Sequence, residues 1–177
     1  MIEEQSMIIE NTQLEDVILI KLDSFEDHRG SYLELYNRKL YQDSGIKTDF
    51  VEDDISIATR GVIKGVHGDS STWKLVSCLH GKFYLAVINY DQDSKNYGKW
   101  VSFVLSESNN YQVLIPPKHG NGHQCLSDKS IFHYKQSSYY NPKDQFTIKW
   151  NDPRFGIWWP IKTPILSRRD ETGDFVD

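Results

Sequence analysis

Short runs of hydrophobic residues, separated by polar turns, recur along most of the chain. Residues 74–79 alternate between apolar and polar positions, which is typical of a strand with one covered face. Residues 83–88 are almost continuously apolar, which predicts a strand covered on both faces. Residues 101–105 and 112–115 predict further strands, and prolines end the second of them. Many short strands with little helix predict an all-β sandwich or barrel.

The first sixty residues predict elements at the edge of that core. Residues 8–21 contain two apolar runs that suggest outer strands, and residues 31–36 alternate as another strand would. Residues 37–45 predict a short helix, because their final glycine stops the helical pattern. Residues 50–58 predict a strand, and we interpret the consecutive acids at 52–54 as a solvated turn rather than a metal site.

The second half of the chain adds a glycine-rich segment and an aromatic tail. Residues 118–125 read KHGNGHQC, and their glycines and asparagine predict a tight loop flanked by histidines. Residues 130–137 alternate, which predicts a strand with Tyr134 on one face. Residues 147–150 predict a last strand, and the tail after it is rich in Pro, Gly and Trp. We expect this tail to pack over the barrel.

Composition and charge narrow the class of protein. The 177 residues suffice for one domain, which we expect to span residues 1–177. Hydrophobic residues make up 38% and charged residues 25%, as in a folded soluble protein. The net charge of −5 and the lack of a basic stripe argue against nucleic-acid and membrane partners. No apolar run spans a membrane and no signal-peptide pattern is present, so we expect a cytoplasmic protein.

Common catalytic and metal-binding motifs are missing from the sequence. Six histidines invite a metal, but no His-x-His pair occurs, since Gly68 and Asp69 follow His67. Cys78 and Cys125 form no CxxC pair, and we interpret them as reduced structural thiols. The chain also lacks the GxSxG, GxGxxG and Walker A patterns. We therefore predict no metal and no nucleotide-type cofactor.

Proton transfer is the chemistry that the remaining candidates favour. His67, Lys74, Tyr134 and Asp170 can supply a base, a cation, an acid and a carboxylate. Each of them alone has an ordinary structural explanation: a satisfied core histidine, a lysine at a barrel mouth, a packed tyrosine or a solvated loop acid. Residue types alone do not decide between these interpretations.

Eight short motifs occur in one order along the chain. They are DHRG followed by a glutamate, GVIKGVH, KLVSCLHGKFYLAV, YGKW, LIPP, FHYKQSSYYNP, WNDPRFGIWWP and PILSRRD. In these motifs the sequence resembles the nucleotide-sugar 3,5-epimerase family, which includes dTDP-4-dehydrorhamnose 3,5-epimerase, over residues 8–170. The resemblance implies a cupin-type jelly-roll barrel with short peripheral helices, a homodimer, and no metal or cofactor. The implied substrate is a nucleoside-diphosphate 4-keto-6-deoxy sugar, inverted at C3, C5 or both.

The resemblance also assigns roles to individual residues. It implies His67 as the base, Asp170 as its carboxylate partner, Lys74 as the cation that stabilises the enolate, and Tyr134 as the acid. The implied substrate-binding positions are Arg29, Glu34, Glu52, Asp54, Arg60, Lys64, Asn121, His123 and Tyr140.

Several positions depart from the family pattern. Lys64 stands where relatives carry an arginine, which keeps the charge but loses the bidentate fork. Acids at 52–54 replace a Gln-Asp-Asn run, the segment between His67 and Lys74 is shorter, and Asn121 replaces a histidine. These departures are similar to a subgroup that acts on GDP-linked 4-keto-heptoses in capsule pathways. Two other functions remain open at this point: a non-catalytic nucleotide-sugar-binding jelly roll, and a metal-dependent cupin oxygenase.

Overall fold

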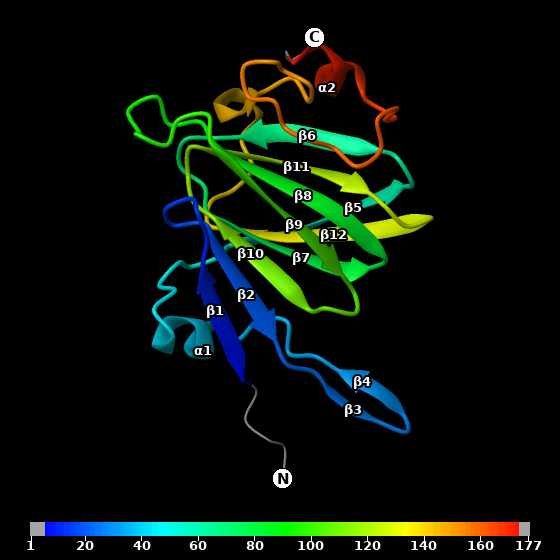
Figure 1. Cartoon of the computed structure of the whole chain (residues 1–177). Coiled ribbons are helices and arrows are strands. Elements are labelled where there is room, and N and C mark those ends of the chain that lie inside the picture. Colours follow the sequence, from blue (N-terminus) through cyan, green and yellow to red (C-terminus); the bar gives the residue numbers. More distant parts are fainter. Residues whose placement is uncertain (1–5, 174–177) are drawn as a thin grey trace.

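Two antiparallel β-sheets face each other in the computed structural model, which describes residues 6–173 (Figure 1). The six-stranded sheet contains, in spatial order, β1 (Met7–Asn11), β2 (Ile18–Leu22), β10 (Tyr111–Ile115), β7 (Lys74–His80), β12 (Lys129–Gln136) and β5 (Glu52–Thr59). The five-stranded sheet contains β13 (Phe146–Thr147), β6 (Ile63–Gly68), β11 (His119–Cys125), β8 (Lys82–Asn89) and β9 (Trp100–Ser106). The all-β architecture expected from the sequence is confirmed.

The main core lies between the two sheets. Strand β8 contributes Phe83, Leu85 and Val87 from one side, and strand β7 contributes Val76 and Cys78 from the other. Residues 83–89 of β8 are all buried, because the other face of this strand is covered as well. The near-continuous apolar run therefore predicted the environment of this strand correctly.

The outer faces of the sheets are covered by segments from the two ends of the chain. Ile157 and Trp159 of the C-terminal tail pack on the five-stranded sheet, as predicted. Helix α1 (Arg38–Asp43) starts at its N-cap Asn37, and its Tyr41 packs on the six-stranded sheet. Helix α2 (Arg168–Thr172) and a 3₁₀ turn, η1 (Pro142–Asp144), follow late in the chain.

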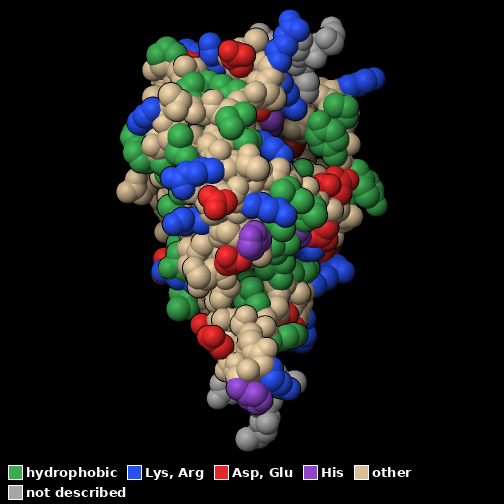
Figure 2. All heavy atoms as spheres, turned by 90° about the vertical axis from the view of Figure 1, so that its right-hand side faces the viewer, with side chains coloured by type: hydrophobic (Ala, Val, Ile, Leu, Met, Phe, Trp, Pro, Cys, Tyr) green, Lys and Arg blue, Asp and Glu red, His purple; other side chains and the backbone are tan. Residues whose placement is uncertain are grey.

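A separate hairpin, β3 (Phe25–Asp27) with β4 (Gly30–Tyr32), projects from the body of the molecule. It forms the narrow lower end in both views, whereas α2 lies at the upper end (Figures 1 and 2). No helix within residues 6–173 is long and apolar enough to cross a membrane.

The predicted loop at residues 118–125 is wrong, because His119–Cys125 form strand β11 between β6 and β8. Its glycines are strand residues at places of close packing. A Cβ on Gly120 would lie 2.8 Å from Val66, and one on Gly122 would lie 3.1 Å from Trp159. The strand has glycine on one face and polar residues on the other, so its hydrophobic alternation is absent.

Three smaller differences share one physical reason. The strand predicted at residues 31–36 ends at Tyr32, and the strand predicted at 147–150 consists of Phe146–Thr147 only. The acids at 52–54 begin strand β5 rather than forming a turn. Leu33 and Leu35, which were predicted to continue the strand at residues 31–36, pack on the outer face of the six-stranded sheet. Local alternation does not reveal which segments find a strand partner.

Candidate active site

A histidine–aspartate pair connects strand β6 with helix α2. Nε2 of His67 lies 2.6 Å from Oδ1 of Asp170. The His67 side chain is 26% exposed, whereas that of Asp170 is 4% exposed. The imidazole is therefore accessible from the solvent while its carboxylate partner is enclosed.

Asp170 is held as a charged carboxylate by further donors. The Gly65 N–H donates to Oδ1 at 3.2 Å, and the Ser167 hydroxyl donates to Oδ2 at 2.8 Å. Burial acts to raise the pKa of Asp170, but the contact with His67 and these donors outweigh it and hold the pKa below its ordinary value. An ionised carboxylate accepts hydrogen bonds only, so Nε2 of His67 carries the hydrogen between them. Nδ1 is then free to accept a proton, as a general base requires.

Gly65 makes this arrangement possible. Its φ of +121° is rarely adopted by other residues. A Cβ at this position would lie 2.5 Å from Cα of Gly122 and 2.7 Å from the carbonyl oxygen of Asn121. Only glycine lets β6 approach β11 this closely while its N–H points at Asp170.

Asn121 and His123 extend the site along strand β11. Asn121 lies directly opposite His67 in the strand register, and its Oδ1 is buried without a hydrogen-bond partner. The His123 ring stacks on Phe132 at 4.1 Å, which connects the two sheets across the interior. Burial, followed by the positive charge of Lys64, lowers the pKa of His123 to about 3. His123 is therefore neutral at physiological pH.

Lys74 lies at the first position of β7 and is buried, with 8% of its surface exposed. Its Nζ is 3.8 Å from Oδ2 of Asp69, an equally buried carboxylate. Burial lowers the pKa of Lys74, Asp69 opposes this effect, and the nearby Arg169 adds to it. A buried ammonium with a lowered pKa is typical of functional sites.

Tyr134 lies on β12, opposite Val76 of β7 and Asp54 of β5. Its ring packs at 5.4 Å from Phe132, the residue on which His123 stacks. Burial, and then the negative charges of Asp54 and Glu52, raise the pKa of Tyr134 to about 12. The phenol therefore keeps its hydrogen and is able to donate it.

A carboxyl pair borders Tyr134. Gln136 donates to Glu52 at 2.6 Å and to Asp54 at 3.0 Å. The Tyr140 N–H also donates to Glu52, at 3.1 Å, which brings a half-exposed tyrosine to the same place. Burial and the neighbouring Glu52 raise the pKa of Asp54. These carboxyl groups offer acceptors for hydroxyl or amino donors of a ligand.

Some predicted binding residues lie elsewhere in the single chain. Arg29 belongs to the projecting hairpin and pairs with Asp27, and Glu34 lies just after that hairpin next to Asn37. Arg60 precedes the first residue of β6 and donates to the carbonyl of Leu126. His67 lies near the other end of β6. The structure therefore does not bring these three predicted positions to His67.

Lys64 spans the gap between the sheets at their shared edge. Its Nζ donates to the Ser56 hydroxyl at 2.7 Å and to the carbonyl of Ile57 at 3.1 Å. The positive charge of Lys64 lowers the pKa of His123, so the lysine belongs to the same part of the interior as His123. Figure 2 shows a hollow in the upper half of one face, with histidine, basic and acidic side chains visible inside it.

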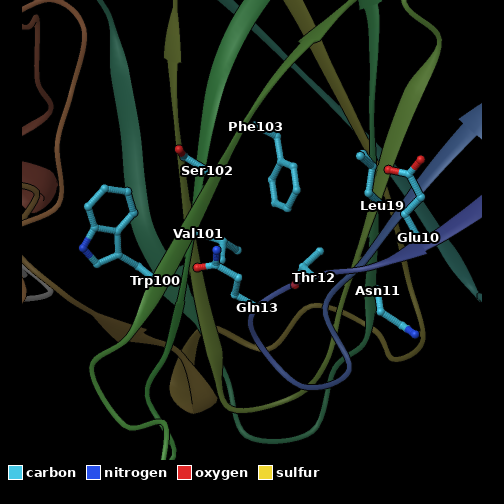
Figure 3. A pocket seen from close by; sticks show the side chains of 9 residues that line it. All are labelled: Glu10, Asn11, Thr12, Gln13, Leu19, Trp100, Val101, Ser102 and Phe103. Atoms are coloured by element: carbon cyan, nitrogen blue, oxygen red, sulfur yellow. The ribbon is translucent and has the colours of Figure 1, made fainter.

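A second open space lies at another edge of the molecule. This groove of about 630 Å³ is lined by the end of β1, the turn after it and strand β9 (Figure 3). It contains none of the proton-transfer candidates, and its Trp100 indole is already bonded to the carbonyl of Phe155. We take the interior around His67 as the candidate site, because His67 contacts Asp170 there and the charges of His67, Asp170 and Lys64 act on His123.

Residues 6–173 contain no cluster of three or more His, Cys, Asp or Glu side chains that could hold a metal ion. That the protein works without a metal or cofactor stays a prediction. Two site residues were missed from the sequence, Asp69 and Arg169. Asp69 follows His67 by two positions and Arg169 precedes Asp170, but only the fold shows that both are near Lys74.

Comparison with known proteins agrees with this geometry. The family model described as dTDP-4-dehydrorhamnose 3,5-epimerase matches residues 11–177. The chain is 34% identical to dTDP-4-dehydrorhamnose 3,5-epimerase of Shigella flexneri, with 97% of each chain covered. It is 35% identical to the enzyme of that name from Escherichia coli K12, with 93% of this chain and 92% of the relative covered.

Solved structures give the same result. The dTDP-6-deoxy-D-glucose-3,5-epimerase of Legionella pneumophila, in complex with dTDP-4-keto-L-rhamnose, matches with a TM-score of 0.91 and 34% identity, covering 95% of this chain and 92% of that one. The Bacillus anthracis dTDP-4-dehydrorhamnose 3,5-epimerase matches with a TM-score of 0.91 and 30% identity, covering 97% and 100%. The jelly-roll fold implied by the sequence motifs is thereby confirmed. The chain belongs to the dTDP-4-dehydrorhamnose 3,5-epimerase family.

Proposed function

We propose that the protein epimerises a nucleoside-diphosphate 4-keto-6-deoxy sugar at C3, C5 or both, through an enolate. The observation that supports this most is the pair of His67 and Asp170, whose Nε2 and Oδ1 lie 2.6 Å apart with the imidazole partly exposed. The buried Lys74 and the protonated Tyr134 offer the cation and the acid. A base, a cation and an acid around one space are the groups that this reaction requires.

Each step follows from the protonation states in the site. Nδ1 of His67 removes the proton from the carbon next to the ketone, and the C–H electron pair becomes the enolate. Asp170 stabilises the imidazolium that forms. The ammonium of Lys74 stabilises the negative charge on the C4 oxygen. Tyr134 returns a proton from the opposite face, the ketone re-forms, and the carbon is inverted.

We further propose a GDP-linked heptose as the substrate. The curated relatives are named for dTDP sugars, but this chain carries Lys64, Asn121 and the acids Glu52 and Asp54 at positions of the family pattern that otherwise hold different residues. Paired carboxyl groups repel a diphosphate and accept hydrogen bonds from hydroxyl and amino groups. A nucleotide or sugar that offers more donors fits that change. Such a substrate also fits the cytoplasmic location expected from the sequence.

We also propose a homodimer in which the projecting hairpin reaches a second copy. Arg29 is 76% exposed at the end of the molecule away from α2, so a binding role for it requires another chain. Ile55, Ile57 and Leu79 expose 62%, 52% and 42% of their surface on the six-stranded sheet. Exposed apolar residues on and near an edge strand are normally covered. Light scattering should report a dimer, and Ile57→Asp should weaken it, whereas Val104→Asp on β9 should not.

Incubation in D₂O with GDP-, CDP- and dTDP-linked 4-keto sugars tests the proposed activity. We expect deuterium at C3, C5 or both with the preferred nucleotide, read by mass spectrometry and NMR. Binding of every sugar without deuterium uptake would instead indicate a non-catalytic binding protein. Stoichiometric iron in the purified protein would favour an oxygenase.

A further inference from the structure

A buried carboxylate behind Lys74 has no role in the chemistry described so far. Asp69 is 3% exposed, lies in the turn between β6 and β7, and is 3.8 Å from the Lys74 ammonium. An ionised group in the interior is costly unless it is hydrogen-bonded or paired. Asp69 satisfies this condition through hydrogen bonds, which also hold its carboxylate in place near Lys74.

Three neutral donors hold the Asp69 carboxylate. The backbone N–H groups of Ser71 and Thr72 donate to Oδ1 at 3.0 and 2.7 Å. The side chain of Gln145 donates to Oδ2 at 3.2 Å. Burial acts to raise the pKa of Asp69, but the Thr72 side chain, the Ser71 N–H, the charge of Lys74 and the Thr72 N–H together outweigh it, so the pKa lies below its ordinary value. Asp69 is therefore a fixed negative charge.

The contact between the two charged groups is longer than a hydrogen bond. A charge-assisted N–H···O contact is about 2.7–2.9 Å long, compared with 3.8 Å here. The attraction between the charges remains at this distance, because it falls off only as the inverse of the separation. The hydrogens of the ammonium are then still available for a ligand oxygen.

The residues that flank Lys74 in the sheet are uncharged, and its charged neighbour on α2 is positive. Gln136 of β12 and Ile115 of β10 flank it in the sheet, and neither is charged. From helix α2, Arg169 acts against the lysine's charge, while its Nε donates to Thr147 at 2.9 Å. Asp69 is thus the negative charge that opposes both burial and Arg169.

We propose that Asp69 is a positioning residue that keeps Lys74 as an ammonium and directs it at the ketone oxygen of the substrate. This inference rests on the proposed epimerase activity, in which that ammonium stabilises the enolate. The residue does not touch the substrate itself. A carboxylate at this position also explains why a lysine is tolerated inside the barrel.

The pH dependence of kcat separates this role from a merely structural one. Activity requires protonated Lys74, so it is lost as pH rises through the pKa of this lysine. Asp69→Asn keeps an oxygen for the Ser71 and Thr72 donors but removes the charge that favours the ammonium. We expect the alkaline limb of the profile to move to lower pH by roughly one pH unit. We expect kcat to change more than KM, and Asp69→Glu to restore part of the shift.

Arg169→Gln provides a test of opposite sign. It removes a positive charge beside Lys74, so the alkaline limb should move to higher pH. This variant keeps the inference testable if Asp69→Asn does not fold. Asp152→Asn is the matched control, because Asp152 also accepts a hydrogen bond from a backbone N–H two residues on and pairs with an arginine, in this case the exposed Arg154.

A readout independent of activity is the NMR titration of lysine ¹⁵Nζ, with Lys74 assigned through Lys74→Met. We expect its transition at lower pH in Asp69→Asn and at higher pH in Arg169→Gln. Unchanged transitions in both variants would overturn the inference even if the wild type is active. Wild-type protein without deuterium exchange, but with the predicted ¹⁵Nζ shifts, would contradict the proposed function and leave the electrostatic role of Asp69 intact.

Discussion

Replacement of Asp170 by asparagine tests the support that this residue gives to the base. The amide oxygen can still accept from His67 and from the Gly65 N–H, and the side-chain volume is nearly unchanged. The negative charge opposite the imidazolium is lost. Since the wild-type contact is 2.6 Å long and the Asp170 side chain is only 4% exposed, little solvent replaces that charge.

The expected cost follows from the strength of such a contact. A hydrogen bond to a charged group contributes about 1.5–3 kcal/mol. The imidazolium develops as the proton is transferred, so this energy stabilises the transition state more than the bound substrate. At about 1.36 kcal/mol for each factor of ten, kcat should fall by roughly 10- to 150-fold. KM should change little, because the Asp170 side chain is enclosed and not open to a ligand.

The assay is the initial rate of deuterium uptake from D₂O into the 4-keto sugar, measured against substrate concentration. Asp152→Asn serves as the control, since the same chemical change at a carboxylate that pairs with Arg154 instead of His67 should leave kcat unaltered. A value of kcat for Asp170→Asn within about threefold of wild type would refute the reasoning, as it falls short of the smallest expected energy.

Three further outcomes are expected. Tyr134→Phe should lower the rate of inversion by roughly 10²–10⁴-fold but preserve deuterium exchange by His67; equal loss of both would contradict its role as the acid. Asp54→Asn should raise the melting temperature at pH 7 but not at pH 3. The raised pKa of Asp54 means that its ionised form, present at pH 7, destabilises the folded state, whereas its protonated form at pH 3 does not. A larger gain at pH 3 than at pH 7 would contradict this. Gly65→Ala should cost roughly 2–5 kcal/mol in denaturant unfolding, because its Cβ would lie 2.5 Å from Gly122, whereas Gly156→Ala, which meets nothing within 4 Å, should cost less.

The hydrophobic pattern predicted the parts of the fold that bury apolar side chains. The strand at residues 83–88, the helix beginning after Asn37 and the covering tail were all predicted for the right physical reason. Strand β11 was missed because polar residues alternate with glycines along most of it, so no hydrophobic alternation marks it. Polar side chains and glycines occupy the positions at which apolar residues normally allow a strand to be recognised from the sequence.

The candidate site shows the same division. The family motifs suggested His67, Asp170, Lys74 and Tyr134 together. The structure pairs His67 with Asp170, and the joint catalytic role of the four residues stays a prediction. Asp69 was not identified, because its partner depends on how the turn between β6 and β7 folds back. The exposed position of Arg29 was also not predicted, since the sequence does not show at which end of the folded molecule the β3–β4 hairpin lies.

The role of His67 is tested most directly by His67→Asn in D₂O with the preferred 4-keto nucleotide sugar. Binding, measured by calorimetry, should stay within a few-fold of wild type, while deuterium uptake at the carbon next to the ketone should disappear. Wild-type rates of uptake in this variant would show that another group removes the proton.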